Sequence, residues 1–319
     1  MSLPMISVIG SLNVDLISRT PRIPNGGETL VAHSFDTGSG GKGANQAVAC
    51  AKLSRSRNAM SQPLVEVQMV GAVGEDAFGV DLLKSLTNVG IETKDIVVKP
   101  KEKTGVAVIL IEDNGENRIL LSSNANFSLR PEQFHALQIP LPDLIILQLE
   151  IPLDTVLQIL KLAAHQKVDV LLNPAPAQQL PKEALKAVTH LVVNESEASI
   201  IAGLEEKQID WKIDSPERRD LLRLGPKHVI VTLGSSGGLY YSAAEGRLSK
   251  YEAKKVHVRD TTAAGDTFVG AYAVAVTLSK NRSHDAMMKA VGIANTAASI
   301  TVQRAGAQAA IPWRDEVES

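Results

Sequence analysis

The sequence contains a single cysteine, Cys50, in 319 residues, so no disulfide bond can form within the chain. Cys50 lies in an alanine-rich stretch, where a free cysteine packs as a small hydrophobic residue. A chain without disulfides is typical of a reducing compartment, which predicts a cytosolic location, with the nucleus also open for a eukaryotic source. The first ten residues resemble no signal peptide, and no apolar run reaches membrane-spanning length. We therefore expect no membrane partner.

Aromatic residues and excess charge are also scarce. Aromatics make up 3% of the chain, and the formal net charge is −2. Alanine, valine, leucine and isoleucine must therefore build the core, which suits a parallel sheet buried under helices on both faces. The densest basic stretch, residues 99–103, is interrupted by a proline and a glutamate. A nucleic-acid partner is therefore not predicted, and the length suits one domain over residues 1–319.

Short apolar runs alternate with helical periodicity along most of the chain. The predicted strands cover residues 6–10, 65–70, 144–149, 168–172, 190–193 and 228–232. The predicted helices cover residues 44–53, 77–88, 154–165 and 217–224, and residues 54–64 are interpreted as a surface insertion. This alternation is typical of βαβ units and predicts an α/β fold with a mainly parallel sheet.

Two segments, residues 12–37 and 104–122, break this rhythm. Residues 106–111 and 117–121 flank Glu112-Asp-Asn-Gly-Glu116, which predicts a β-hairpin. We expect the two segments to form a small antiparallel lid over the active site. Ligands of open α/β sheets bind beyond the carboxyl ends of the strands. Polar residues or glycine follow several predicted strands, namely Asn13, Asp15, Glu150, Asn194 and Gly234.

A glycine-rich loop, Gly38-Ser-Gly-Gly-Lys-Gly43, directly precedes a predicted helix. Glycine lets the backbone approach a ligand closely and adopt positive φ. The loop matches neither the phosphate loop ending in Lys-Ser/Thr nor the dinucleotide pattern, so a dinucleotide-dependent dehydrogenase is not predicted. A flexible turn with a surface lysine is one interpretation. The donors of Lys42 and Asn45 favour the other, a site for a polyhydroxylated ligand.

A second segment, Asp260-Thr-Thr-Ala-Ala-Gly-Asp-Thr-Phe268, opens an apolar helix. Free N–H groups and the helix dipole make such a helix start an anion site. Asp266 in the first turn is either a charge that complements the dipole or a base that takes a hydroxyl proton during phosphoryl transfer. The small residues Ala263, Ala264 and Gly265 clear space that a cap does not need, and they favour the base.

Two further segments carry weaker signals. Asn194-Glu-Ser-Glu197 follows a strand and suits Mg²⁺ with its water ligands. A charged helix start is the simpler explanation of the same residues. The glycine-rich turn Thr232-Leu-Gly-Ser-Ser-Gly-Gly238 also follows a strand and could hold a nucleotide phosphate or ribose.

Together these segments resemble the ribokinase (PfkB-type) family of sugar kinases, in order and over nearly the whole chain. The resemblance is carried by Gly10-Ser-Leu-Asn-Val-Asp15, Gly27-Glu-Thr29, Gly40-Gly-Lys-Gly-Ala-Asn-Gln-Ala47, Gly71-Ala-Val-Gly-Glu-Asp76, Thr104-Gly-Val-Ala107, Gln148-Leu-Glu150, Asn173-Pro-Ala-Pro-Ala177, Asn194-Glu195, Thr232-Leu-Gly-Ser235, the Asp260–Phe268 segment and Arg304-Ala-Gly-Ala-Gln308. It implies a three-layer α/β/α sandwich with a mainly parallel central sheet. It also implies a small β-sheet lid, at about residues 12–37 and 104–122, that joins two copies in a homodimer.

The resemblance also implies a role for each matching position. The residues that it implies for sugar binding are Asn13, Asp15, Gly41, Lys42, Gly43, Asn45, Glu150 and Asp266. Asp266 is the implied catalytic base, with the backbone of Ala263, Ala264 and Gly265 as the anion hole. The implied ATP contacts are Asn194, Thr232, Leu233, Gly234, Ser235, Ser236, Gly237, Gly265, Asp266 and Asn295.

Two metal ions are implied as well. Glu197 would organise Mg²⁺ through water. The implied K⁺ ligands, mostly backbone carbonyls, belong to Asp260, Thr262, Thr301, Arg304, Gly306 and Ala310. Ala310 stands where bacterial members of the family often carry serine, so the K⁺ site would be weaker if a hydroxyl is needed there.

The implied reaction is in-line transfer of the γ-phosphate of ATP to the 5-hydroxyl of D-ribose. Deoxyribose, fructose and adenosine are alternative acceptors. Asn13, Asp15, Lys42 and Asn45 favour a small furanose with free 2- and 3-hydroxyls. A catalytically inactive sugar-binding protein would show an altered base or anion loop, and neither is altered here.

Overall fold

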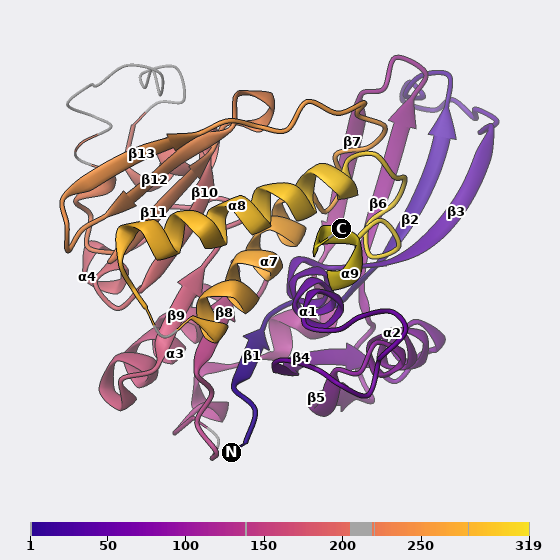
Figure 1. Cartoon of the computed structure of the whole chain (residues 1–319). Coiled ribbons are helices and arrows are strands. Elements are labelled where there is room, and N and C mark those ends of the chain that lie inside the picture. The colour runs from indigo at the N-terminus through magenta and orange to yellow at the C-terminus, as the bar shows by residue number, and fades with distance from the viewer. Residues whose placement is uncertain (1, 138, 205–218, 220, 280, 319) are drawn as a thin grey trace.

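A nine-stranded sheet forms the centre of the computed structural model, which describes residues 2–137, 139–204, 219, 221–279 and 281–318 (Figure 1). The strand order is β13-β12-β11-β10-β9-β8-β1-β4-β5. The strands are β1 (Met5–Ile9), β4 (Glu66–Gly74), β5 (Glu92–Lys99), β8 (Leu144–Leu147), β9 (Asp169–Leu172), β10 (His190–Asn194), β11 (His228–Thr232), β12 (Gly238–Ser242) and β13 (Arg247–Tyr251). Neighbours from β11 to β5 pair in parallel, and β12 and β13 add an antiparallel edge.

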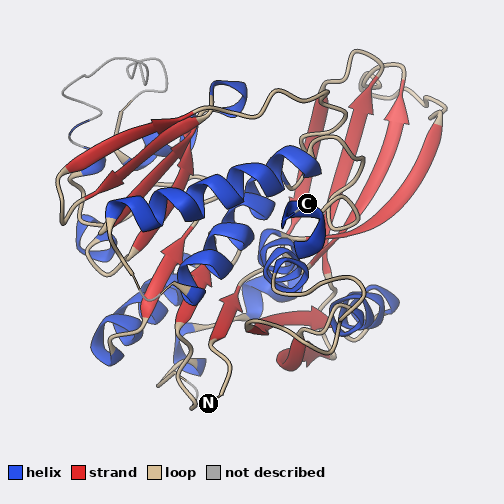
Figure 2. Cartoon of the chain, in the orientation of Figure 1, coloured by secondary structure: helices blue, strands red, loops and turns tan. Residues whose placement is uncertain are grey.

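Helices cover both faces of this sheet (Figure 2). The core on one face includes α1 (Lys42–Leu53), α2 (Ala77–Asn88), α7 (Ala264–Leu278) and α8 (His284–Thr301). The core on the other face includes α3 (Leu153–Gln166), α4 (Lys182–Leu185) and α5 (Glu195–Ile201). Along β8, Leu144 and Ile146 join the first core, whereas Ile145 and Leu147 join the second. The predicted three-layer sandwich with a mainly parallel sheet is confirmed.

Helices α1 and α7 approach each other closely because small residues meet at their contact. A Cβ atom on Gly270 would lie 2.3 Å from the Cβ of Ala49 and 2.9 Å from the backbone nitrogen of Cys50. The thiol of Cys50 lies 3.7 Å from the carbonyl oxygen of Gly270, and burial raises its pKa. This contact holds the first turns of the two helices at the same edge of the sheet.

A second sheet stands apart from the first, at the upper right of Figure 1. It has the order β3-β2-β6-β7, built from β2 (Asn13–Thr20), β3 (Ser34–Gly40), β6 (Gly105–Glu112) and β7 (Asn117–Ser122). The hairpin predicted around residues 112–116 is confirmed, because β6 and β7 pair antiparallel. The lid as a whole is not antiparallel, since β2 pairs in parallel with β6. A long excursion through α1, β4, α2 and β5 separates these strands and permits a parallel pair.

Some elements differ from the predictions or were missed. The strands β5, β12 and β13 and the helix α8 were not predicted. Of the predicted helix at 217–224, residues 217, 218 and 220 lie outside the described residues, and residues 219, 221 and 222 are helical. The insertion at 54–64 is anchored by Arg55, which is 5% exposed and donates to the carbonyl oxygens of Ala51 and Gly90. Within the described part of the chain, no helix has the length and apolar character needed to cross a membrane.

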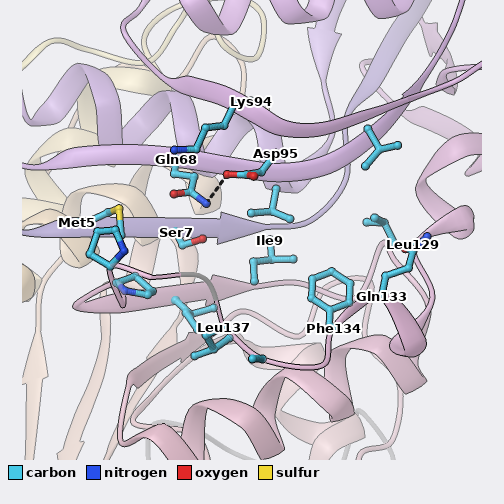
Figure 3. A pocket seen from close by; sticks show the side chains of 16 residues that line it. Met5, Ser7, Ile9, Gln68, Lys94, Asp95, Leu129, Gln133, Phe134 and Leu137 are labelled. Carbon is cyan, nitrogen blue, oxygen red and sulfur yellow. Dashed lines mark hydrogen bonds between the residues drawn. The ribbon is translucent and has the colours of Figure 1, made fainter.

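The remaining elements are short. They are the 3₁₀ turns η1 (Asn124–Ser128), η2 (Pro131–Gln133) and η4 (Gly234–Ser236) and the helix α9 (Arg314–Glu318). A pocket of about 390 Å³ lies over β1, β4 and β5 (Figure 3). Gln68 and Asp95 line it, joined by a hydrogen bond of 2.9 Å from Nε2 to Oδ2. This pocket lies alongside the strands rather than beyond their carboxyl ends, where ligands of such sheets bind.

Candidate active site

Glu150 joins three segments at the carboxyl end of the sheet. Its Oε2 atom accepts hydrogen bonds from Ser11 Oγ at 2.5 Å, from the backbone nitrogen of Lys42 at 3.0 Å and from Asn13 Nδ2 at 3.5 Å. Glu150 follows β8, Ser11 follows β1, Asn13 begins the lid and Lys42 begins α1. The predicted sugar residues from three distant parts of the chain therefore meet here.

Asn126 is a buried residue of this site that the sequence analysis did not single out. Its Nδ2 donates to Asn13 Oδ1 at 2.8 Å and to the carbonyl oxygen of Leu12 at 3.1 Å. Its Oδ1 accepts from the backbone nitrogen of Leu12 at 2.9 Å, and the residue is 1% exposed. Asn126 therefore fixes the orientation of the Asn13 amide. The only signal in the sequence is an asparagine just beyond the second lid segment.

The glycines of the predicted sugar loop make room for neighbouring segments. Gly41 precedes α1 with φ +88°, and a Cβ atom on it would lie 2.7 Å from the backbone nitrogen of Asn13. A Cβ atom on Gly43 would lie 2.6 Å from the backbone nitrogen of Ser11, and one on Gly40 would lie 2.3 Å from Asp15 Oδ1. The loop thus packs tightly against the residues that present Asn13 and Asp15, so it is not a flexible turn.

Asp266 lies in the first turn of α7 and is 7% exposed. Its Oδ2 accepts a hydrogen bond from Asn45 Nδ2 at 3.0 Å, and its Oδ1 accepts from Gln46 Nε2 at 2.9 Å. Both donors come from the first turns of α1. The contact between α1 and α7 therefore brings together the two segments that the sequence analysis identified separately.

The backbone in front of α7 has the form of an anion site. Ala263 adopts left-handed φ/ψ values of 59° and 10°, and the backbone nitrogen of Ala264 donates to the carbonyl oxygen of Thr261. The backbone N–H groups of Gly265 and Asp266 meet no acceptor among the described residues. A Cβ atom on Gly265 would have nothing within 4 Å. Free donors thus face open space at the positive end of a helix dipole.

Acidic side chains dominate the electrostatics of the site. Burial, and then the negative charges of Glu150 and Asp266, raise the pKa of Asp15 to about 7. Burial lowers the pKa of Lys42, but the charges of Asp266, Glu150 and Glu197 outweigh it and raise that pKa overall. Lys42 is therefore the cation that balances the buried carboxylates.

Asn194 and Glu197 form a reciprocal cap at the start of α5. Asn194 Oδ1 accepts from the backbone nitrogen of Glu197 at 2.8 Å. The two oxygens of Glu197 accept from the backbone nitrogen and Nδ2 of Asn194, each at 2.9 Å. Burial raises the pKa of Glu197, although the hydrogen bond from the Asn194 backbone and the charge of Lys42 oppose it. The pair thus caps the N-terminus of α5, and the carboxylate of Glu197 interacts with the charge of Lys42.

The predicted nucleotide turn follows β11. Thr232 Oγ1 donates to the carbonyl oxygen of Val193 at 3.3 Å, and the backbone nitrogen of Leu233 donates to Gly237 at 2.8 Å. Asn295 on α8 donates instead to the carbonyl oxygen of Glu252 at 2.9 Å. A Cβ atom on Gly237 would lie 2.8 Å from the Cα of Glu252. Asn295 and the turn therefore meet through Glu252, and no hydrogen bond joins them directly among the described residues.

Most of the residues implied for K⁺ lie on two loops that Asp260 ties together, and Thr301 ends α8. Asp260 Oδ1 accepts from Thr262 at 2.9 Å (N) and 2.6 Å (Oγ1), and Oδ2 accepts from the backbone nitrogen of Gly306 at 2.9 Å. Burial raises the pKa of Asp260, but these hydrogen bonds outweigh it and lower that pKa. Ala310 is 1% exposed and offers no side-chain oxygen.

The side chains of the other two implied K⁺ positions have protein partners. Thr301 Oγ1 donates to Thr267 Oγ1 at 3.0 Å, and the Arg304 guanidinium pairs with Glu316 at 2.6 Å. Because a guanidinium has no acceptor atom, Arg304 can offer an ion only its backbone oxygen. Among the described residues, no three His, Cys, Asp or Glu side chains gather as a metal site.

A cavity of about 1030 Å³ separates the lid from these loops. Asp15, Ile17 and Ile119 line it from the lid, and residues 258–262 and 305–309 line it from the body of the protein. Asp15 thus faces the space between the second sheet and these loops.

The chain is similar to known proteins over nearly its whole length. The family model described as "pfkB family carbohydrate kinase" matches residues 3–314. The chain is 42% identical to a ribokinase of Schizosaccharomyces pombe, over 98% of this chain and 96% of that protein. It is 37% identical to a deoxyribokinase of Salmonella typhi, over 84% of each chain.

A solved structure has the same fold. The Arabidopsis thaliana ribokinase complexed with ribose and ATP matches with a TM-score of 0.83 and 30% sequence identity. The match covers 100% of this chain and 98% of the other.

Proposed function

Since the chain belongs to the pfkB family of carbohydrate kinases, we propose that it transfers the γ-phosphate of ATP to the 5-hydroxyl of D-ribose. One observation carries the proposal. Asp266 is held between two amides of the sugar loop, directly beside the free N–H groups that begin α7. A base and an anion hole at one helix start are what attack by a hydroxyl on a phosphoryl group requires.

The sugar is held first. Asn13, Lys42 and Asn45 donate to its hydroxyls, and the carboxylates of Asp15 and Glu150 accept from them. The hydrogen bonds that Glu150 receives from Ser11 and Asn13 keep this set in place before the sugar arrives. Such preorganisation reduces the entropy lost when the reacting groups are brought together.

The transfer itself needs one proton acceptor and one anion site. The 5-hydroxyl gives its proton to Asp266 as its oxygen forms a bond to the γ-phosphorus. The bond from that phosphorus to the β,γ-bridging oxygen breaks, and ADP leaves with the electron pair. The backbone N–H groups of Gly265 and Asp266, with Ala263 and Ala264 shaping the turn, stabilise the charge on the transferring group.

The nucleotide and its ions occupy the neighbouring loops in this proposal. The Thr232–Gly237 turn, Asn194 and Asn295 would contact ATP, and Glu197 would hold Mg²⁺ through water, where the ion would supply charge neutralisation of the phosphates. Backbone carbonyls of the Asp260–Thr262 and Arg304–Ala310 loops suit K⁺. The tie between Asp260 and Gly306 supports this, because it fixes both loops beside the start of α7.

A panel of acceptors tests the proposal. ADP release is measured with ATP, Mg²⁺ and K⁺ against ribose, deoxyribose, fructose and adenosine, and ³¹P NMR identifies the phosphorylated position. Ribose should give the highest kcat/KM, with a single 5-phosphate product. A higher kcat/KM for another acceptor, or phosphate on another hydroxyl, contradicts the proposal.

Deoxyribose is the second candidate, favoured by the identity to a deoxyribokinase. The two sugars differ only at the 2-hydroxyl. A site built to hydrogen-bond a hydroxyl rejects the analogue without it, because buried polar groups lose their partner. The buried, charged environment of Asp15 and Glu150 therefore favours ribose.

We further propose a homodimer formed through the lid, in the cytosol. Large apolar side chains are exposed on the lid, including Phe35 at 61%, Leu120 at 71% and its cross-strand partner Val108 at 36%. Contiguous exposed apolar residues of this kind mark interaction surfaces. Sedimentation should show a dimer, and Leu120→Lys should shift it toward the monomer; a monomeric wild type contradicts the proposal.

A further inference from the structure

Three side-chain amides meet behind Asp266. Gln46 belongs to α1, Gln148 follows β8 and Asn173 follows β9, and they are 0%, 0% and 9% exposed. Gln46 Nε2 donates to Asp266 Oδ1 at 2.9 Å and to Asn173 Oδ1 at 3.0 Å. Gln46 Oε1 accepts from Gln148 Nε2 at 2.6 Å. Every polar group of the Gln46 amide is thus engaged.

A backbone carbonyl sets the direction of these hydrogen bonds. Asn173 Nδ2 donates to the carbonyl oxygen of Val192 at 3.0 Å. A carbonyl only accepts, so the nitrogen of Asn173 must face Val192 and its oxygen must face Gln46. Gln46 must then present its NH₂ group on this side, where Asp266 also lies. The amide of Gln46 therefore donates to the carboxylate and cannot turn its oxygen toward it.

This arrangement leaves one group without a partner. Gln148 Oε1 is buried and has no hydrogen bond within the described part of the chain. It faces Gly10, where a Cβ atom would lie 2.0 Å away. An unpaired buried acceptor destabilises the folded protein. Turning the Gln148 amide over would place its oxygen against the oxygen of Gln46, so the cost persists as long as Gln46 donates to Asp266.

We propose that Gln46 is a positioning residue for the base Asp266, held in its donating orientation by Asn173 and Gln148. The inference rests on the proposed function, in which Asp266 takes the proton of the attacking hydroxyl. Gln46 holds Oδ1 and Asn45 holds Oδ2, so the plane of the carboxylate is fixed by one amide on each side.

The expected kinetic signature is a loss of kcat rather than of sugar affinity. Gln46 is fully buried and cannot contact the sugar itself. Misplacing a catalytic group by about 1 Å costs roughly 100-fold in rate. Gln46→Met should therefore lower kcat by about 10- to 100-fold while the KM for ribose changes by less than about threefold.

A double-mutant cycle separates positioning from general stability. Gln46→Met is made in the wild type and in Asp266→Asn, and kcat is measured in all four proteins. A residue that acts through Asp266 has little further effect once the base is gone, so the loss in the Asp266→Asn background should be less than about threefold. An equal loss in both backgrounds, or a raised KM with unchanged kcat, overturns the proposal.

Gln68 supplies a matched control. It is a buried glutamine whose Nε2 donates to the carboxylate of Asp95 at 2.9 Å, but it lies in the pocket beside the sheet (Figure 3). Gln68→Met removes the same kind of amide–carboxylate hydrogen bond at a partly buried position outside the active site and should keep kcat within about twofold. A loss similar to that of Gln46→Met would mean that any buried amide has this effect, which overturns the proposal.

A second variant covers the case in which Gln46→Met does not fold. Gln46→Glu keeps the shape and the acceptor for Gln148 but turns an oxygen toward Asp266. At lower pH the two adjacent carboxylates share one proton, which restores a hydrogen bond between them, whereas at higher pH both are charged and repel each other. The kcat of Gln46→Glu relative to wild type should therefore be lower at pH 8 than at pH 6. A pH-independent ratio contradicts the proposal. Wild-type turnover of ribose in the same assay tests the proposed function separately, and the cycle is run with whichever sugar is turned over.

Discussion

Replacing Asp15 by asparagine should stabilise the folded protein while weakening its sugar site. Burial, and then the charges of Glu150 and Asp266, raise the pKa of Asp15 from 3.8 to about 7. The unfolded chain keeps the ordinary pKa, so the folded protein holds this proton more tightly between these two values. The resulting stability is full below about pH 4 and is lost as the pH rises through about 7.

The magnitude follows from the two pKa values. Each pKa unit corresponds to about 1.4 kcal/mol. Relative to low pH, the raised pKa of Asp15 lowers the free energy of unfolding by about 4 kcal/mol at pH 8 and by about 2 kcal/mol at pH 5. Asparagine has no charge to bury, so the gain in unfolding free energy should grow by about 2–3 kcal/mol between pH 5 and pH 8. The same change should raise the KM for ribose by about 10- to 100-fold, because a charged acceptor is lost.

Urea unfolding at both pH values, with circular dichroism as the signal, measures the effect. Asp76→Asn is the control with the opposite sign. Burial raises the pKa of Asp76, but hydrogen bonds from Thr104 and Gly79 outweigh it and lower that pKa. This control should lose stability at pH 8. A gain for Asp15→Asn that does not change with pH, or a loss at pH 8, would refute the reasoning.

Three further predictions concern other parts of the molecule. Gly270→Ala should separate α7 from α1 at Ala49 and cost about 1–3 kcal/mol in urea unfolding, with a loss of kcat as Asp266 moves. Burial lowers the pKa of His228 to about 4, and that of His190 further. As the pH falls, these histidines gain protons in the unfolded chain first, so the free energy of unfolding should decrease below about pH 6.5. The Asp15→Asn variant lacks the opposing effect of Asp15, and an equal free energy of unfolding at pH 7 and pH 5 in this variant would contradict the prediction. Ala310→Ser should lower the K⁺ concentration for half-activation, and an unchanged value would show that a hydroxyl is not needed there.

The sequence predicted the layers of the fold because the apolar runs are long and regular. Leu144 to Leu147 are apolar at every position, as in a strand buried on both faces. The order of the strands was not predicted, since this pattern does not specify which strand lies beside which. The parallel pairing of β2 with β6 was missed for the same reason. It depends on where the intervening units place the second lid segment.

The local chemistry of the site was predicted better than its connections. The loops containing Asn45 and Asp266 were each identified from small residues beside polar ones. The hydrogen bond between them joins residues 221 positions apart, which no local pattern encodes. Gln46 and Asn173 belong to segments that carry the family resemblance, but no role was predicted for them. Which end of a side-chain amide donates and which accepts depends on its partners in the folded structure. Their contact likewise spans 127 positions.

The most direct test of the account is to compare ribose binding with turnover in Asp266→Asn. Asparagine keeps the shape of the side chain but cannot accept the proton of the attacking hydroxyl. If Asp266 is the base, kcat should fall by about 10²- to 10⁴-fold, while calorimetric titration should still detect ribose binding. A variant that retains near-full kcat with ATP and ribose would contradict the assignment of Asp266 as the base.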